Sequence, residues 1–243
     1  MNEILFLISA FFSEIIGTIA GFGSSTIFLP LALFFVDFKT ALVLVALFHI
    51  FGNIGRLTFF KHGLSKRLLL IFGLPSIIFT ILGASLVGYI SQELLKLILG
   101  IFLIIFSLAM LIRPDIKFKK SKRNAIAGGS LSGFFAGLIG TGGAMRGAFL
   151  TSFNLNKNIY IATAAAIALA VDITRVPIYF GSGFLKQEFY YLVPLLLITA
   201  ILGSYIGSRI VKKIPQNKFR KFVLIAIALV SMKFICEGIN YLA

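Results

Sequence analysis

Apolar runs of membrane-spanning length recur along the whole of this chain. Six of them are clear, at 41–60, 68–90, 94–112, 159–180, 189–210 and 222–243. A helix needs ~20 apolar residues to cross the hydrocarbon core of a bilayer. The composition, 59% hydrophobic and 13% charged, agrees with this pattern and excludes an ordinary soluble domain. The sequence therefore predicts an all-α, polytopic membrane protein.

Two further apolar stretches, 3–36 and 124–153, are too long for one crossing and too short for two. Each carries a glycine cluster near its middle, at 21–26 and at 140–143. A break at these glycines would make each stretch a re-entrant hairpin, which enters the membrane and returns to the same face. Irregular backbone at membrane depth is tolerated only where it is buried in protein or lines a polar cavity. We therefore expect both hairpin tips in the protein interior.

The two halves of the chain are related at an offset of 119 or 120 residues. The matching pairs are Gly17 and Gly137, Gly23 and Gly143, Asn53 and Asp172, Pro75 and Pro194, and Gly83 and Gly203. This predicts two repeats, 1–116 and 117–243, each with one hairpin followed by three spans. Many transporters are built from such internal repeats.

Most of the 23 lysine and arginine residues lie in three loops between apolar runs. They are Arg56, Lys61, Lys66, Arg67, Arg113, Lys117, Lys119, Lys120, Lys122, Arg123, Arg209, Lys212, Lys213, Lys218, Arg220 and Lys221. Basic loops mark the cytoplasmic side, so we expect 61–67, 115–123 and 212–221 there, with 91–93 and 182–188 outside. Equivalent loops of the two halves then face opposite sides, which predicts inverted repeats. Eight simple spans are the alternative.

Two hairpin tips that meet inside the membrane would bring free helix N-termini together. Their unpaired N–H groups and positive dipole ends favour an anion. The candidate substrate ligands are Gly23, Ser24, Ser25, Thr26, Thr141, Gly142 and Gly143. The alternative is that these glycines only allow close helix packing.

Ionisable residues inside the apolar runs are candidates for function, because each costs ~3 kcal/mol on insertion scales. Arg146 is the main candidate, since its planar fork of donors suits an oxyanion. Its alternative role is an ion pair with Glu14 or Asp172. Arg175 is a second candidate anion ligand, although its i, i+3 spacing from Asp172 also allows a local pair.

Four residues are candidates for ion coupling or for counter-ions: Glu14, Asp172, His49 and Asn53. His49 and Asn53 are spaced i, i+4 in one span, and histidine changes charge near neutral pH. A hydrogen-bonded structural histidine is the alternative. Arg56 lies close enough to the end of its span that we expect it to extend to the cytoplasmic surface.

The segments GTIAGFGSSTIFLP (17–30) and GFFAGLIGTGGAMRGAFL (133–150) resemble the paired signatures of the TauE/SafE sulfite-exporter family. The resemblance implies a secondary transporter of small sulfur-containing or organic anions, such as sulfite, thiosulfate or sulfoacetate. Two departures leave the substrate open. Serine and threonine follow Gly23 where glycines are frequent in the family, and Arg146 stands where Thr26 stands in the first segment.

We therefore expect a transporter of the cell membrane that works by alternating access, with a passive anion channel or an intramembrane enzyme as alternatives. The enzyme is disfavoured because the chain has no His-Glu-x-x-His spacing and only one cysteine. The expected partners are a small anion, the lipid bilayer and, as an open option, further copies of the chain. We expect no cofactor and no metal. Despite the net charge of +15, we expect no nucleic acid, because the basic loops lack an aromatic platform.

Overall fold

The structure is a computed structural model that describes residues 2–20, 23–59, 63–113, 118–210 and 216–242, with the backbone alone at 216–220. Within these ranges the chain is almost entirely helical and has no strand. Seven of the described helical segments are long and apolar enough to cross a membrane: Glu3–Ala20, Phe38–Phe59, Lys66–Tyr89, Gln92–Ile112, Lys157–Gly181, Gln187–Ile210 and Lys221–Leu242. Six coincide with the six predicted spans, and the seventh is the first arm of the 3–36 stretch. The all-α, multi-pass membrane class is confirmed.

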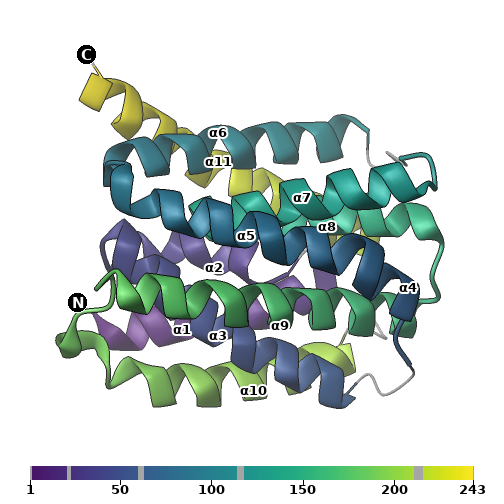
Figure 1. Ribbon diagram of the computed structural model, residues 1–243. Coiled ribbons are helices and arrows are strands. Elements are labelled where there is room, and N and C mark those ends of the chain that lie inside the picture. Colours follow the sequence, from purple (N-terminus) through teal and green to yellow (C-terminus); the bar gives the residue numbers. More distant parts are fainter. Residues whose placement is uncertain (1, 21–22, 60–62, 114–117, 211–215, 243) are drawn as a thin grey trace.

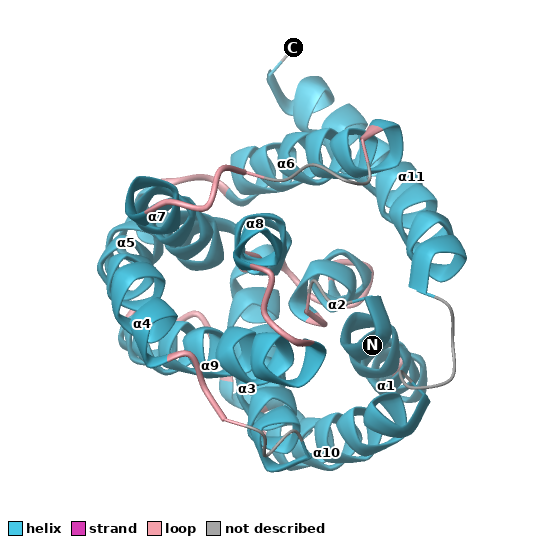
Figure 2. Ribbon diagram, turned by 90° about the vertical axis from the view of Figure 1, so that its right-hand side faces the viewer, coloured by secondary structure: helices cyan, strands magenta, loops and turns pink. Residues whose placement is uncertain are grey.

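The long helices lie side by side and run from one end of the molecule to the other (Figure 1). They are α1 (Glu3–Ala20), α3 (Phe38–Phe59), α5 (Leu74–Leu86), α6 (Gln92–Ile112), α7 (Lys122–Ile139), α9 (Lys157–Gly181), α10 (Leu192–Ile210) and α11 (Gln216–Leu242). A short helix α4 (Lys66–Leu68) and a π-helical turn η1 (Leu69–Gly73) lead into α5. Single 3-10 turns are η2 (Val87–Tyr89), η3 (Thr151–Phe153) and η4 (Gln187–Phe189). Two short helices, α2 (Ser25–Ala32) and α8 (Gly143–Leu150), lie in the middle of the bundle (Figure 2).

The chain doubles back between α1 and α2. Phe6, near the start of α1, contacts Phe28 of α2 and Phe35 just beyond it, at ring-centroid distances of 5.2 and 5.8 Å. Gly23 has a φ of 85°, a left-handed conformation that favours glycine. Gly17 allows the tight return, since a Cβ there would lie 2.5 Å from the Ser24 nitrogen. Residues 21 and 22, where the predicted break begins, lie outside the described residues.

A second reversal separates α7 from α8. Gly140 ends α7 with a φ of 73°, and Ser132 of α7 donates a hydrogen bond to the Gly142 carbonyl at 2.9 Å. Beyond α8, the Ser152 hydroxyl accepts from the Phe118 N–H, and the Phe118 ring stacks on Phe149. The end of α8 therefore lies beside the chain that leads into α7.

Glycines allow the long helices to approach backbone to backbone. On α7, a Cβ at Gly129, Gly133 or Gly137 would lie 2.3, 2.0 or 2.3 Å from a carbonyl oxygen of η1 or α5. On α10, a Cβ at Gly203 would lie 2.8 Å from the Glu14 Cβ of α1. Small residues permit such close contacts between membrane helices. The α7–α5 and α1–α10 contacts each join a helix of residues 1–116 to a helix of residues 117–243.

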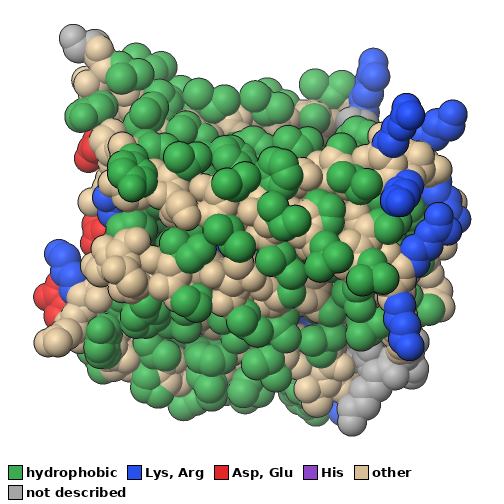
Figure 3. Space-filling view, viewed as in Figure 1, with side chains coloured by type: hydrophobic (Ala, Val, Ile, Leu, Met, Phe, Trp, Pro, Cys, Tyr) green, Lys and Arg blue, Asp and Glu red, His purple; other side chains and the backbone are tan. Residues whose placement is uncertain are grey.

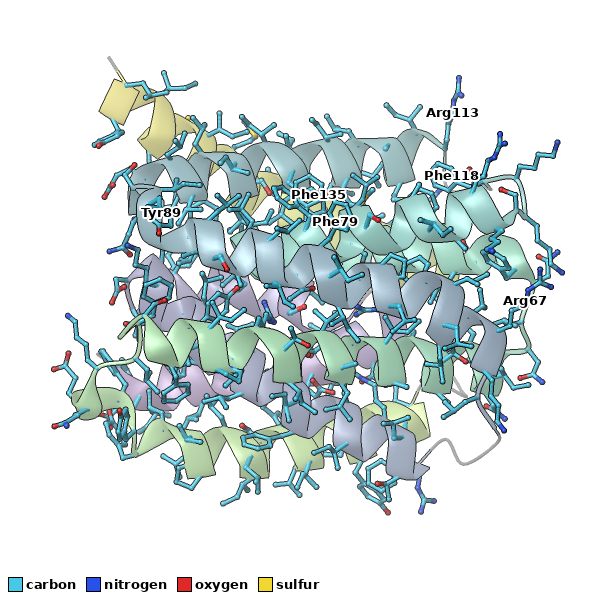
Figure 4. The ribbon with its side chains drawn as sticks, viewed as in Figure 1. Arg67, Phe79, Tyr89, Arg113, Phe118 and Phe135 are labelled. Atoms are coloured by element: carbon cyan, nitrogen blue, oxygen red, sulfur yellow. The ribbon has the colours of Figure 1, made fainter. Side chains whose placement is uncertain are left out.

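Lysine and arginine side chains gather at one end of the molecule, and apolar side chains cover the wall between the two ends (Figure 3). Arg67, Lys120 and Lys122 line a hollow at this basic end, where Figure 4 labels Arg67 and Arg113. Gln92 and Lys186 line a hollow at the opposite end. The described parts of the basic loops thus lie at one end, and 91–93 and 182–188 lie at the other. Lys61, Lys117, Lys212 and Lys213 lie outside the described residues.

Candidate functional site

A hydrogen-bonded charge network surrounds Asp172 of α9. Asp172 Oδ2 lies 2.8 Å from His49 Nδ1 and 3.4 Å from Asn53 Nδ2, both on α3. Arg175, one turn further along α9, donates to Asp172 Oδ1 from Nε at 2.9 Å, and its Nη2 lies 2.7 Å from the same oxygen in an ion pair. All four side chains are buried. Because an ionised carboxylate only accepts hydrogen bonds, the His49 proton is on Nδ1.

A second network surrounds Arg56 near the end of α3. Its guanidinium donates to Glu14 Oε1 at 2.5 Å, to Asn53 Oδ1 at 2.7 Å, and to the hydroxyls of Thr18 and Ser24 at 3.2 Å each. Arg56 is only 6% exposed, so the expectation that it extends to the cytoplasmic surface is wrong. The buried Glu14 carboxylate on α1 pairs with it within the bundle.

Asn53 joins the two networks. Its amide nitrogen donates to Asp172, and its amide oxygen accepts from Arg56. The pairs Asn53–Arg56 and Asp172–Arg175 are each spaced i, i+3 and are equivalent at an offset of 119 residues. The same helical position thus supplies a neutral amide in one half and a carboxylate in the other.

A cavity of about 40 Å³ lies beside these networks. Its lining includes Thr18, Gly23, Asn53, Arg56, Gly143 and Arg146. Since ~10–15 Å³ admits one water, the cavity has room for a few waters or one small oxyanion. Tyr160, in the first turn of α9, also lines it. Thr163, next to the lining residue Ala164, accepts a hydrogen bond from the backbone N–H of Ser65. Ser65 lines the hollow at the basic end, so the cavity lies on the basic-end side of the two networks.

Arg146 lies on α8 and is 5% exposed. No carboxylate of the described residues forms an ion pair with it. The alternative role of Arg146, an ion pair with Glu14 or Asp172, is not found here, because Glu14 pairs with Arg56 and Asp172 pairs with Arg175 and His49. The Arg146 guanidinium faces the cavity together with that of Arg56.

The predicted site residues of the two reversals have different surroundings. Thr26 Oγ1 and Thr141 Oγ1 are hydrogen-bonded at 2.8 Å, which connects the start of α2 to the chain before α8. Arg175 donates to the Ala136 carbonyl from Nη1. Of the predicted substrate ligands, Arg146, Gly23 and Gly143 line the cavity, and Ser24 contacts Arg56 beside it; Ser25, Thr26, Thr141, Gly142 and Arg175 are not among its lining residues. Thr26 and Arg146, which stand at matching places in the two glycine-rich segments, therefore do not both line this cavity.

Sequence reasoning missed several residues of this site, among them Arg56, Thr18 and Tyr160. Arg56 was assigned to the surface, although its equivalence to Arg175 at an offset of 119 residues was a signal for an interior role. Thr18, which lines the cavity and accepts from Arg56 Nε, gave no signal beyond its place after Gly17.

Two buried polar atoms of the site have no hydrogen-bond partner in the described part of the chain, namely Glu14 Oε2 and His49 Nε2. Both Glu14 oxygens lie against Gly52 of α3, where a Cβ would be 2.6 Å from each. His49 Nε2 is turned toward Gly23, where a Cβ would lie 3.4 Å from it.

The bundle and its interior site define a multi-pass membrane protein with a buried network of arginines and carboxylates beside a small cavity. The chain belongs to the sulfite exporter TauE/SafE family, whose sequence model matches residues 5–234. The resemblance of the two glycine-rich segments is thereby confirmed.

Curated relatives include the probable membrane transporter protein YfcA of Escherichia coli strain K12 and its counterparts from E. coli O6:H1 (strain CFT073) and O157:H7. Each is 28% identical over 171 residues, which cover 64% of this chain and 60% of the relative. The match thus spans less than two thirds of the relatives' length. No solved structure matches the chain.

Proposed function

We propose that this protein is a secondary transporter that moves a small sulfur-containing or organic anion across the cell membrane by alternating access. The observation that carries the proposal is Arg146, a buried guanidinium that faces a cavity and pairs with no carboxylate among the described residues. An unpaired charge in the interior of a membrane protein is costly. An oxyanion in the cavity would compensate it through bidentate hydrogen bonds.

Further features of the site favour an anion. Arg56 adds a second guanidinium to the cavity wall. Gly143, the first residue of α8, also lines the cavity, and the positive end of a helix dipole favours negative charge. The name of the family and that of the YfcA relatives support transport rather than catalysis.

We also propose that residues 1–116 and 117–243 are inverted repeats, and that α1–α2 and α7–α8 are re-entrant hairpins. Three observations support this: the two reversals at glycines, the equivalent α1–α10 and α7–α5 contacts, and the basic loops at one end only. Broken helices that meet at a central site are typical of secondary transporters. With Cys236 replaced by serine, a Lys186→Cys variant is expected to react with an impermeant thiol reagent from outside intact cells. Reaction only after permeabilisation would contradict the inverted orientation.

In this proposal, the described conformation is closed toward the opposite end. Phe28 of α2 and Phe48 of α3 pack together there at a ring-centroid distance of 4.8 Å, and Leu29 and Leu42 pack around the Gly140 turn. The Thr26–Thr141 hydrogen bond lies in the same closed region. Transport would require these contacts between the two reversals to separate.

The proposal is tested by binding and uptake of sulfite, thiosulfate and sulfoacetate. Purified full-length protein is expected to bind at least one of these anions, and proteoliposomes are expected to accumulate it against its gradient when a proton or voltage gradient is imposed. Uptake that only equilibrates the anion with the imposed voltage would identify a passive channel instead. Failure to bind any small oxyanion would contradict the assignment of the cavity.

A further inference from the structure

The buried charges of the interior do not cancel. Leaving tyrosines aside, the buried ionisable side chains of the described residues are Glu14, His49, Arg56, Arg146, Asp172 and Arg175. Three arginines against two carboxylates leave one positive charge when His49 is neutral and two when it is protonated. In a low-dielectric interior, each uncompensated charge is strongly unfavourable. The protonation of His49 therefore sets the charge of the anion that the site can neutralise.

His49 is placed to change its charge in response to an anion. Its Nδ1 is held by Asp172, and its Nε2, fully buried, has no partner among the described residues. A second proton would therefore go to Nε2. The position of a Cβ on Gly23, which lines the cavity, is 3.4 Å from His49 Nε2, 3.8 Å from Arg146 Nη2 and 3.9 Å from Gly143 Cα. His49 Nε2 and Arg146 Nη2 thus lie on the same side of Gly23, each within 4 Å of one point at the cavity wall.

The other charged groups around His49 give the direction of the effect. Asp172 on α9 favours the protonated imidazole, whereas Arg56 on α3, the helix of His49 itself, and Arg146 on α8 oppose it. Glu14 on α1 is occupied by Arg56, and Asn53 is neutral. An anion between His49 and Arg146 would offset the two arginines and favour the second proton. By linkage, the proton in turn favours the anion by the same factor.

We propose that the site binds a doubly charged oxyanion together with one proton on His49, and a singly charged anion while His49 is neutral. This inference rests on the proposed function. In this proposal, the dianion lies in the cavity beside Gly23 and accepts hydrogen bonds from His49 Nε2–H and from the Arg146 guanidinium. The protein then transports a dianion and a proton together, and the loaded site is electrically neutral in both cases.

The test uses two probes whose own charge stays constant between about pH 5.5 and about pH 8.5, a range that brackets the usual titration of histidine. Thiosulfate is a dianion over this range and methanesulfonate a monoanion. For the wild-type protein, the thiosulfate Kd is expected to rise by up to about tenfold per pH unit above the titration of His49, while the methanesulfonate Kd stays constant. In weakly buffered solution, thiosulfate binding is expected to take up about one proton per site, and methanesulfonate binding none.

The matched variant is His49→Gln, which keeps a side-chain amide near Asp172 and cannot be protonated. We expect its thiosulfate Kd to be high and independent of pH, and its methanesulfonate Kd, whatever its value, to be independent of pH as in the wild type. A melting temperature in detergent close to that of the wild type shows that the variant is folded. A pH-independent thiosulfate Kd in the wild type, or a pH dependence retained in His49→Gln, would overturn the inference while leaving anion binding intact. Absence of binding of either probe to the wild type would contradict the proposed function itself.

Discussion

Asn53 donates a hydrogen bond to Asp172 across the centre of the molecule, with Nδ2 3.4 Å from Oδ2. These two residues lie 119 residues apart, the offset at which the sequence predicts equivalent positions in two repeats. Because one is an amide and the other a carboxylate, the two halves meet without a repulsion between like charges. The arginine that follows Asn53 therefore obtains its carboxylate from α1, as Glu14, while Arg175 uses Asp172 of its own helix.

Replacing Arg146 is expected to weaken anion binding with little effect on folding. Arg146→Gln removes the bidentate donor, and we expect the Kd to rise at least tenfold, equivalent to ~1.4 kcal/mol. Arg146→Lys should recover part of the loss, since a point charge does not reproduce the fork. Isothermal titration with purified protein measures both effects. The control is Arg209→Gln, which removes an exposed arginine that packs on Tyr205. An unchanged Kd in Arg146→Gln would assign a structural role to Arg146.

Gly23→Ala is expected to block the anion, because the added methyl group would occupy the point between His49 Nε2 and Arg146 Nη2. We expect binding to fall at least tenfold, as for loss of an ion contact. Gly23 also has a positive φ, so backbone strain must be separated from steric exclusion. Gly63→Ala is the matched control, since Gly63 has a φ of 92° and no atom within 4 Å of its Cβ position. Equal losses of binding in both variants would indicate strain alone.

Glu14→Gln is expected to destabilise the protein, because it leaves the buried Arg56 without its carboxylate. Breaking a buried pair costs ~3–5 kcal/mol, which should lower the Tm in detergent by many degrees. The double variant Glu14→Gln with Arg56→Gln removes both charges, and we expect it to be more stable than Glu14→Gln alone. Additive losses in the double variant would show that the pair does not contribute to stability.

Cross-linking residues 26 and 141 is expected to stop transport without preventing binding. In a Cys236→Ser background, Thr26→Cys and Thr141→Cys place thiols where the two hydroxyls are now 2.8 Å apart. Under mild oxidation, uptake into proteoliposomes should cease, and a reducing agent should restore it. Anion binding measured in detergent should persist in the oxidised protein. Undiminished uptake by the cross-linked protein would show that the two reversals need not separate.

The helices could be predicted from the sequence because membrane thickness imposes their length. The predicted span 94–112 is the helix Gln92–Ile112, and the difference arises at Ser91, whose hydroxyl accepts the Leu94 N–H and sets the first turn. Hydropathy does not report such caps. It also does not report where a polar side chain finds its partner.

The site was predictable in its residue types and less so in its pairings. Arg146, His49 and Asp172 stood out because charge is rare in apolar helices. That Glu14 pairs with Arg56 depends on how α1 lies on α3, and on Gly52 leaving space for the carboxylate. Neither fact has a local signal, so the sequence does not predict the pairing of Glu14 with Arg56.

The glycine contacts between α7 and α5 have a mechanical consequence. Gly129, Gly133 and Gly137 face carbonyl oxygens of η1 and α5 at successive turns. The helices are so close that a methyl group on any of these glycines would clash with a carbonyl oxygen. Sliding by one residue would bring bulkier side chains such as Phe134 against the same carbonyls. The two helices therefore cannot slide along each other, and we expect α5 and α7 to move as one rigid unit. The expected hinge of this movement is Gly140, where the chain leaves α7 and continues to α8, the helix that carries Arg146.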